Sequence, residues 1–205
     1  MEYEHSSENT QQDRERIKNT VPETVLVCLH DLVHLLAGIL LVLLLLFRIV
    51  IVSGPSMNAT LVDGDFLLLL SNVFYNDPQP GDIIVASLDS FKNGEPIIKR
   101  VIATEGQTVD IDFAAGVVYV DGVALDEPYT LTPTNREEGN HFPMTVDEGC
   151  IFVMGDNRNL SKDSRNPEIG LIDKREVLGK AIFLLFPGTD GGTTKPQYDR
   201  IGALS

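Results

Sequence analysis

Ser56 and Lys99 are the residues whose types and settings best suit covalent chemistry in this sequence. Ser56 stands at the centre of "VSGPSMNATL", residues 52–61, where Gly-Pro constrains the backbone just before it. A serine hydroxyl is a weak nucleophile unless a neighbouring base takes its proton. Lys99 stands in "PIIKRVIAT", residues 96–104, and a lysine that loses its proton can act as such a base.

The setting of Lys99 leaves three outcomes open. If residues 96–104 form a strand, Ile97, Lys99 and Val101 share one face, and Ile98 and Arg100 lie on the other. A lysine on an apolar face can extend its amine to water, pair with a carboxylate, or lose its proton because burial penalises the charged form. From this strand alone, an amine that stays in water is the most common outcome.

Two other stretches bear on the choice of base. His141, in "EEGNHFPM", is the sole histidine after residue 52 and offers a Ser-His-Asp arrangement, although a histidine in such a loop is more often plain surface. The segment "MGDNRNLSKDSRN", residues 154–166, concentrates charged and amide side chains after a β-like run. Such a segment forms either a loop whose polar groups hydrogen-bond one another or an ordinary charged surface loop.

The segment before Ser56 is apolar enough to enter a membrane. Residues 35–47 are entirely apolar or Gly, and after Arg48 the run resumes through Val52, close to the roughly 20 residues that cross a bilayer. We place the span at residues 33–52, between an N-terminal tail, residues 1–32, and a folded part, residues 53–205. The first 24 residues are polar without an apolar period, which predicts disorder.

The distribution of basic residues orients this span. Arg14, Arg16 and Lys18 precede it, and after Arg48 the next basic residue is Lys92. The positive-inside rule therefore predicts a cytoplasmic N-terminus, with residues 53–205 outside the cytoplasm. A cleaved signal peptide is the alternative, but its apolar core would start nearer the N-terminus.

Residues 53–205 predict a mainly β domain. Short runs with strand-like composition are separated by turn residues such as Asn93-Gly94 and Asp121-Gly122, and no long amphipathic helix interrupts them. We expect antiparallel sheets folded into a sandwich-like or barrel-like structure behind one transmembrane helix. The predicted strands cover residues 66–70, 81–88, 96–104, 107–113, 116–122, 150–155 and 179–186.

The overall composition excludes some functions. The formal net charge is −14, whereas a nucleic-acid-binding protein needs Lys and Arg to neutralise phosphates, so we expect no nucleic-acid partner. The sequence has two cysteines, Cys28 and Cys150, and no metal-ligand spacing, so we expect no metal site.

Taken together, these segments resemble the bacterial type I signal peptidases, membrane-bound serine proteases with a Ser-Lys dyad. "SGPSMNATL" resembles the family's nucleophile segment, "PGDIIV" the next motif, "IIKRVI" the lysine motif and "GDNRNLSKDSR" the polar motif. "VDGVALDEPY" and "VLGKAIFLLFP" are similar to the short, Gram-positive-like members. Four motifs in this order behind one apolar span are a specific signature of the family. They favour a Lys99 that acts as a general base over a Lys99 whose amine stays in water.

The resemblance implies a role for each matching residue. Ser56 matches the nucleophile, Lys99 the general base, and Ser161 the serine that hydrogen-bonds and orients the lysine. The residues implied to brace the site are Arg100, Asp156, Asp163 and Arg165, with Met57 packed beside the nucleophile. The residues implied to line shallow pockets for substrate side chains are Val50, Val52, Leu61 and Ile98.

The sequence departs from the family pattern at several points, one of which is "ATEGQ", residues 103–107, where Gly-Leu-Pro-Gly-Asp is common. Ala59 replaces the usual Pro, and Asn159-Leu160 replaces Asp-Asn in the polar motif. Gly54 stands where some relatives carry a serine that donates to the oxyanion, so the second oxyanion donor is expected to come from the backbone.

The function implied by the resemblance is removal of signal peptides from secretory precursors at the membrane surface, after small residues in an Ala-x-Ala pattern and without a cofactor. Secretory precursors and membrane lipid are the expected partners. The alternatives are a soluble Ser-Lys self-cleaving repressor, a histidine-dependent signal peptidase, and a non-catalytic membrane-anchored β module such as a pseudo-peptidase or pilus-assembly factor. The apolar span argues against the first alternative, and Lys99 argues against the second.

Overall fold

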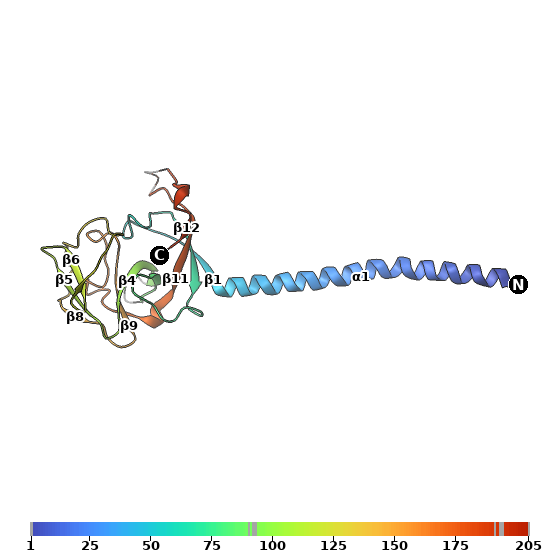
Figure 1. Ribbon diagram of the computed structural model, residues 1–205, viewed down its shortest axis with the longest axis horizontal. Coiled ribbons are helices and arrows are strands. Elements are labelled where there is room, and N and C mark those ends of the chain that lie inside the picture. The colour runs from blue at the N-terminus through green and yellow to red at the C-terminus, as the bar shows by residue number, and fades with distance from the viewer. Residues whose placement is uncertain (1, 90, 92–93, 191, 193–194, 205) are drawn as a thin grey trace. The chain divides into compact units, whose positions relative to one another are not determined.

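The computed structural model describes residues 2–204 apart from 90, 92–93, 191 and 193–194, and for residues 2–22 it describes the backbone only. The chain divides into two units, residues 1–45 and residues 46–205. The first is helical and the second is built from β-strands (Figure 1).

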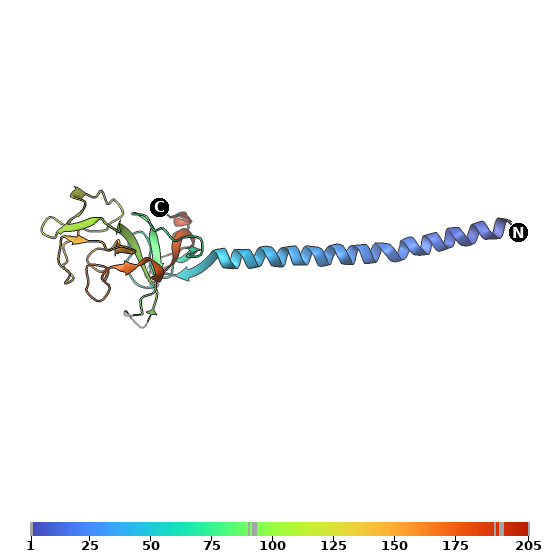
Figure 2. The same ribbon diagram turned by 90° about the horizontal axis from the view of Figure 1, so that it is seen from below.

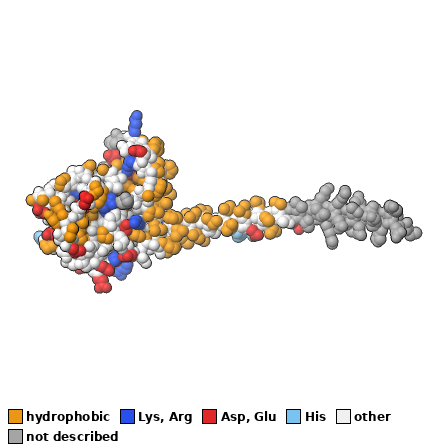
Figure 3. All heavy atoms as spheres, viewed as in Figure 1, with side chains coloured by type: hydrophobic (Ala, Val, Ile, Leu, Met, Phe, Trp, Pro, Cys, Tyr) orange, Lys and Arg blue, Asp and Glu red, His pale blue; other side chains and the backbone are white. Residues whose placement is uncertain are grey.

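The N-terminal unit is a single helix, α1, Glu2–Leu46. Its part Glu23–Leu46 is long and apolar enough to cross a membrane. Figure 3 shows mainly hydrophobic side chains on the visible face of this part of the helix, and its Val, Leu and Ile side chains are exposed, as expected of a helix that faces lipid.

The bounds of this helix differ from the sequence prediction at both ends. Helical backbone begins at Glu2, where disorder was expected, and it ends at Leu46 rather than at Val52. Residues Phe47–Ile51 form strand β1, which pairs antiparallel with Phe66–Leu70. The run of β-branched residues in β1 favours a strand, and the neighbouring strand supplies the backbone hydrogen bonds.

The larger sheet carries most of the residues predicted to be functional. Among the described residues it has eight antiparallel strands in the order β1-β2-β11-β3-β4-β9-β10, with β12 paired to β11 outside this order. The strands besides β1 are β2 (Phe66–Ser71), β3 (Ile83–Ala86), β4 (Ile97–Thr104), β9 (Cys150–Met154), β10 (Ile172–Asp173), β11 (Val177–Phe186) and β12 (Gly202–Ala203).

A smaller antiparallel sheet has the order β7-β6-β5-β8. Its strands are β5 (Thr108–Asp112), β6 (Val117–Val120), β7 (Val123–Ala124) and β8 (Met144–Thr145). β5, β6 and β8 lie at the end of the domain away from β1, as Figures 1 and 2 both show. Two short 3-10 helices, Lys174–Glu176 and Tyr198–Arg200, complete the domain.

The structure confirms the predicted mainly β fold, and every predicted strand is present. The short strands β7, β8, β10 and β12 and the strand β1 were missed. Four of these have only two residues each, too few to give an alternating pattern in the sequence.

Three hydrophobic clusters form the core of the domain. One of them lies beneath the segment that carries Ser56, and it includes Val52, Met57, Leu61 and Ile98. Because β1, β2, β4 and β11 all contribute to this cluster or pack against it, the segment of Ser56 rests on a rigid base.

Candidate active site

Residues 53–65, here called the nucleophile loop, leave β1 and return to the start of β2. The loop is closed at its base because the Val52 N–H donates to the Asp65 carbonyl at 2.8 Å and the Gly64 N–H donates to the Val52 carbonyl at 2.9 Å. Gly54 adopts a φ of 84°, which L residues other than Gly rarely adopt. This closed base gives Ser56 a defined place above the core.

Lys99 lies on β4 directly beside Ser56. The Nζ of Lys99 is 2.9 Å from the Oγ of Ser56 and also donates to the Ile98 carbonyl at 2.9 Å. The Lys99 side chain is buried, with the residue only 4% exposed, so its amine does not extend into water. Burial disfavours the ammonium form, and the distance suits proton transfer from the serine hydroxyl.

The polar segment 154–166 holds the nucleophile loop by hydrogen bonds to the backbone carbonyls of the loop. The Asn157 N–H donates to the Ser56 carbonyl at 3.0 Å, and the Asn157 side chain donates to the Pro55 carbonyl at 3.1 Å. Gly155 allows this close approach, because a Cβ at that position would lie 2.4 Å from the Ser56 carbonyl oxygen and 2.2 Å from the Ser161 Oγ. The glycine of this motif is therefore required by packing.

Two buried ion pairs brace the site. Arg100 donates to both carboxylate oxygens of Asp156, at 2.9 and 2.8 Å. Arg165 makes the same fork-like pair with Asp163 at 2.8 Å to each oxygen, and Asp163 also accepts from the Gly155 N–H. All four charged residues are at least 98% buried, so each pair compensates the charge of its partner within the core.

A third ion pair was not foreseen from the sequence. Arg158 donates to both carboxylate oxygens of Glu127, and Tyr129 donates its hydroxyl to Glu127 at 2.9 Å. Burial is the largest single influence on Arg158 and opposes its charge, but the hydrogen bonds to Glu127 and the nearby negative charges, that of Glu127 first, together outweigh burial and raise the pKa of the guanidinium. Burial and the Glu127 carboxylate likewise raise the pKa of Tyr129.

Tyr129 links this third pair to the strand of Lys99. The Arg100 guanidinium lies 4.0 Å from the centre of the Tyr129 ring, close enough for a cation–π contact. Glu127 and Tyr129 flank Pro128 in "VDGVALDEPY", a stretch similar to the family, so the signal was present in the sequence without a role attached to it.

Ser161 does not make the hydrogen bond expected of it. The residue is 1% exposed, and its Oγ has no hydrogen-bond partner among the described residues. It packs against Gly155 below the nucleophile loop. The structure thus places Ser161 at the site, without showing it orienting Lys99.

A groove of 390 Å³ opens over Ser56 and Lys99. Residues 50–57 line one part of the groove and residues 95–99 another, joined by Phe91, Leu160 and Lys162. Ile97 and Ile98 line the groove and pair with β3 on one edge, whereas the β9 ladder on the other edge of β4 begins only at Arg100. The groove therefore offers an extended peptide a neighbouring strand.

The structure brings three of the four predicted pocket residues to this groove, namely Val50, Val52 and Ile98. Leu61 is not among the lining residues. It is fully buried in the cluster beneath the loop, where its N–H donates to the Met57 carbonyl at 2.9 Å. His141 is exposed on a loop and does not line the groove, so it does not stand where a base for Ser56 would be needed.

Gly54 does not supply a second oxyanion donor in this conformation. Its N–H already donates to the Asp63 carboxylate at 2.8 Å, and Pro55 has no N–H to offer. The Ser56 N–H is therefore the backbone donor that this stretch can direct at a developing oxyanion.

Comparisons with known proteins identify the class. A family model described as "Signal peptidase, peptidase S26" matches residues 24–186. Signal peptidase I of Bacillus licheniformis is 38% identical over 158 residues, which cover 72% of this chain and 81% of that protein. A probable signal peptidase I-1 of Synechocystis sp. is 37% identical over 168 residues, which cover 77% and 82%.

A solved structure, a signal peptidase I from Enterococcus faecalis V583, is 33% identical and covers 51% of this chain and 96% of that chain, with a TM-score of 0.41.

The chain belongs to the peptidase S26 family of signal peptidases. Its activity within the family is that of a signal peptidase I, a membrane-anchored serine endopeptidase. The alternative of a non-catalytic β module is therefore not retained.

Proposed function

We propose that Ser56 is the nucleophile and Lys99 the general base for the removal of signal peptides from secretory precursors. The observation that carries this proposal is the 2.9 Å distance between the Lys99 Nζ and the Ser56 Oγ, with the lysine buried.

The reaction proceeds through an acyl-enzyme. The Ser56 Oγ attacks the scissile carbonyl carbon while the neutral amine of Lys99 takes the hydroxyl proton. The Lys99 ammonium then gives this proton to the leaving amine of the mature protein. Lys99 next takes a proton from water, whose oxygen attacks the ester carbonyl. As the ester bond breaks, the Lys99 ammonium returns that proton to the Ser56 Oγ, and the signal peptide leaves as a carboxylic acid that ionises in water.

The groove favours an extended substrate with small side chains. A peptide laid beside Ile97 and Ile98 can form main-chain hydrogen bonds, whereas Val50 and Val52 leave little depth for its side chains. This selectivity matches the Ala-x-Ala pattern of signal-peptide cleavage sites. Four residues brace the site without contacting the substrate, and they affect cleavage only by holding the nucleophile loop in place. These residues are Arg100, Asp156, Asp163 and Arg165.

The membrane contributes to substrate positioning. The N-terminus lies in the cytoplasm and the β domain outside it, because basic residues precede the apolar part of α1. Between Leu46 and Ser56 a fully extended chain reaches at most about 35 Å. The tether therefore restricts Ser56 to the zone near the lipid surface where a precursor's cleavage site emerges.

Cleavage of a model precursor by the full chain in lipid vesicles tests the dyad. Ser56→Ala and Lys99→Ala should each abolish cleavage while thermal unfolding remains cooperative. Lys99→Arg should be equally inactive, because a guanidinium stays protonated near neutral pH. Lys174→Ala is the matched control, since Lys174 pairs with Glu105 on the surface and should retain full activity. Substantial cleavage by Lys99→Arg would disprove a lysine base.

A further inference from the structure

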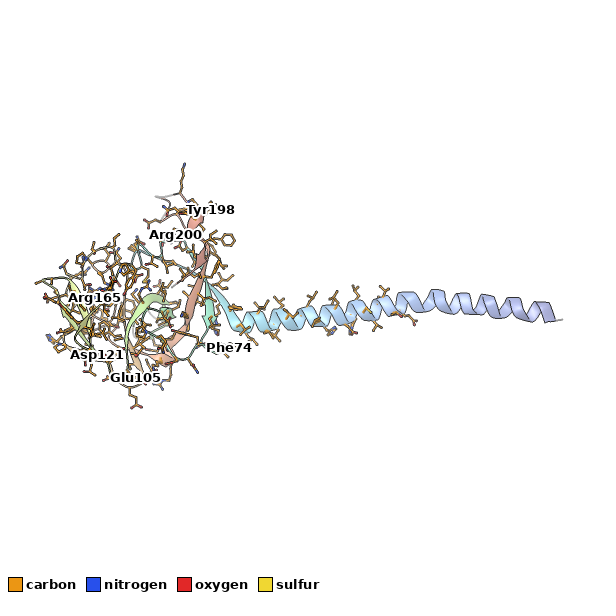
Figure 4. The ribbon with its side chains drawn as sticks, in the orientation of Figure 1. Phe74, Glu105, Asp121, Arg165, Tyr198 and Arg200 are labelled. Carbon is orange, nitrogen blue, oxygen red and sulfur yellow. The ribbon has the colours of Figure 1, made fainter. Side chains whose placement is uncertain are left out.

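The end of the chain lies against the nucleophile loop. β12 pairs with β11 through Phe183 opposite Ala203, and the Leu204 N–H donates to the Ile182 carbonyl at 3.0 Å. Tyr198 and Arg200 lie together beside this pairing (Figure 4). These residues follow the part of the chain that the family model matches, which ends at residue 186.

Arg200 reaches from this segment to Asp65, the residue that closes the nucleophile loop. Asp65 is completely buried, and its carboxylate accepts from the Val62 N–H at 2.8 Å and the Gly188 N–H at 2.7 Å. Two guanidinium nitrogens of Arg200 complete the set at 3.0 and 2.5 Å. Because the other two donors are neutral, Arg200 supplies the positive charge that compensates this buried carboxylate.

The same guanidinium makes a second contact inside the loop. It donates to the Thr60 carbonyl at 3.1 Å. The Thr60 hydroxyl donates to Asp156, and Asp156 holds Arg100, the neighbour of Lys99 on β4. Arg200 thus connects the base of the nucleophile loop to the ion pair that borders the proposed general base.

We propose that Arg200 is a positioning residue, which keeps the nucleophile loop in the conformation that places the Ser56 hydroxyl beside Lys99. This inference rests on the proposed role of Ser56. The planar guanidinium can donate to the Asp65 carboxylate and the Thr60 carbonyl at the same time. A water molecule or an amide could donate hydrogen bonds here, but neither carries the positive charge that Asp65 needs. Without Arg200, the buried Asp65 has no cation, the loop relaxes toward water, and the reacting atoms separate.

The test compares Arg200→Gln with the wild-type full chain in lipid vesicles. Arg200→Gln should lower kcat for a signal-peptide substrate by about 10- to 100-fold with little change in KM, because the groove walls are untouched. A serine-directed acylating probe should label Ser56 more slowly by the same factor. Arg175→Gln is the control, since Arg175 is an exposed arginine that also pairs with an aspartate, Asp173, and should keep wild-type kcat.

Two further variants separate positioning from stability. Arg200→Lys should recover part of kcat, because an ammonium can pair with Asp65 but cannot also hold Thr60. Asp65→Asn combined with Arg200→Gln removes both charges, so Tm should recover while kcat stays low.

Three results would overturn the inference. The first is Arg200→Gln with kcat and acylation within about twofold of wild type below its Tm. The second is recovery of kcat together with Tm in the double variant, which would make Arg200 a stabilising residue alone. The third is a wild-type chain whose Ser56 is not acylated at all, which would also refute Ser56 as the nucleophile. If Ser56 is labelled in the wild type, a failure of the Arg200 proposal is distinct from a failure of the proposed nucleophile.

Discussion

Removing the charge of Asp156 should destabilise the β domain strongly. Asp156→Asn keeps the shape of the side chain but removes the carboxylate charge that pairs with the Arg100 guanidinium, which is 2% exposed. Breaking a buried ion pair by removing one partner costs about 3–5 kcal/mol. Because small domains have a total stability of about 5–15 kcal/mol, a large fraction of the folding free energy depends on this pair.

The magnitude expected for Asp156 follows from its surroundings. It accepts two hydrogen bonds from Arg100 and one from Thr60, whereas Arg100 also donates to the Gly81 carbonyl and contacts the Tyr129 ring, and these two contacts do not depend on the Asp156 charge. The Tyr129 face offsets part of the loss, which places the expected cost nearer the lower figure.

Chemical denaturation of the full chain in detergent measures this cost. Asp173→Asn is the control, because Asp173 pairs with a surface arginine and its loss should change stability far less. Asp156→Asn combined with Arg100→Met replaces the pair by a neutral one and should recover much of the loss. If Asp156→Asn costs no more than Asp173→Asn, the pair is not a structural brace and the reasoning from burial is wrong.

Three other predictions follow from the site and the fold. Activity should rise with pH through neutrality, because only neutral Lys99 accepts the proton and only about one free lysine in 2,500 is neutral at pH 7; a flat or falling pH profile of kcat/KM would contradict this. A chain that starts at Phe47 should keep its activity on a soluble peptide but lose activity on a bilayer-inserted precursor. A chain that starts at Ser53 lacks β1, and its circular dichroism spectrum should be that of an unfolded protein. Burial is the largest single influence on Asp82 and opposes its ionisation, but the hydrogen bonds from Lys180, Tyr75 and the Gln79 N–H, with the charge of Lys180, together outweigh burial and lower the pKa of Asp82. Its ionised form therefore stabilises the fold above the unfolded pKa, and this contribution is lost as pH falls through the folded pKa. Acid unfolding of Asp82→Asn should therefore lack this part of the pH dependence, and an unchanged acid limb would contradict the assignment.

The sequence by itself determined the elements whose signals are local. The strand that carries Lys99 was predicted because a short run rich in β-branched aliphatic residues and the turn residues before it lie within a few positions of one another. Ser56 and the polar segment were found because four motifs occur in order, and each motif is a short continuous stretch. The apolar part of α1 was evident for the same reason, since a membrane span depends on composition over one continuous run.

The tertiary structure alone decided which side chains meet. Arg100 pairs with Asp156 rather than with Asp163, a choice that depends on the register between β4 and β9. The end of α1 at Leu46 depends on a partner strand that begins at Phe66, and the burial of Leu61 depends on how the nucleophile loop folds over its core.

The contact between Arg200 and Asp65 joins residues 135 positions apart. No local pattern encodes such a contact, because its partners are brought together by the pairing of β12 with β11 and of β11 with β2. Sequence patterns report the conformation that each short segment prefers, whereas the active-site geometry depends on long-range registers that only the packed sheet determines.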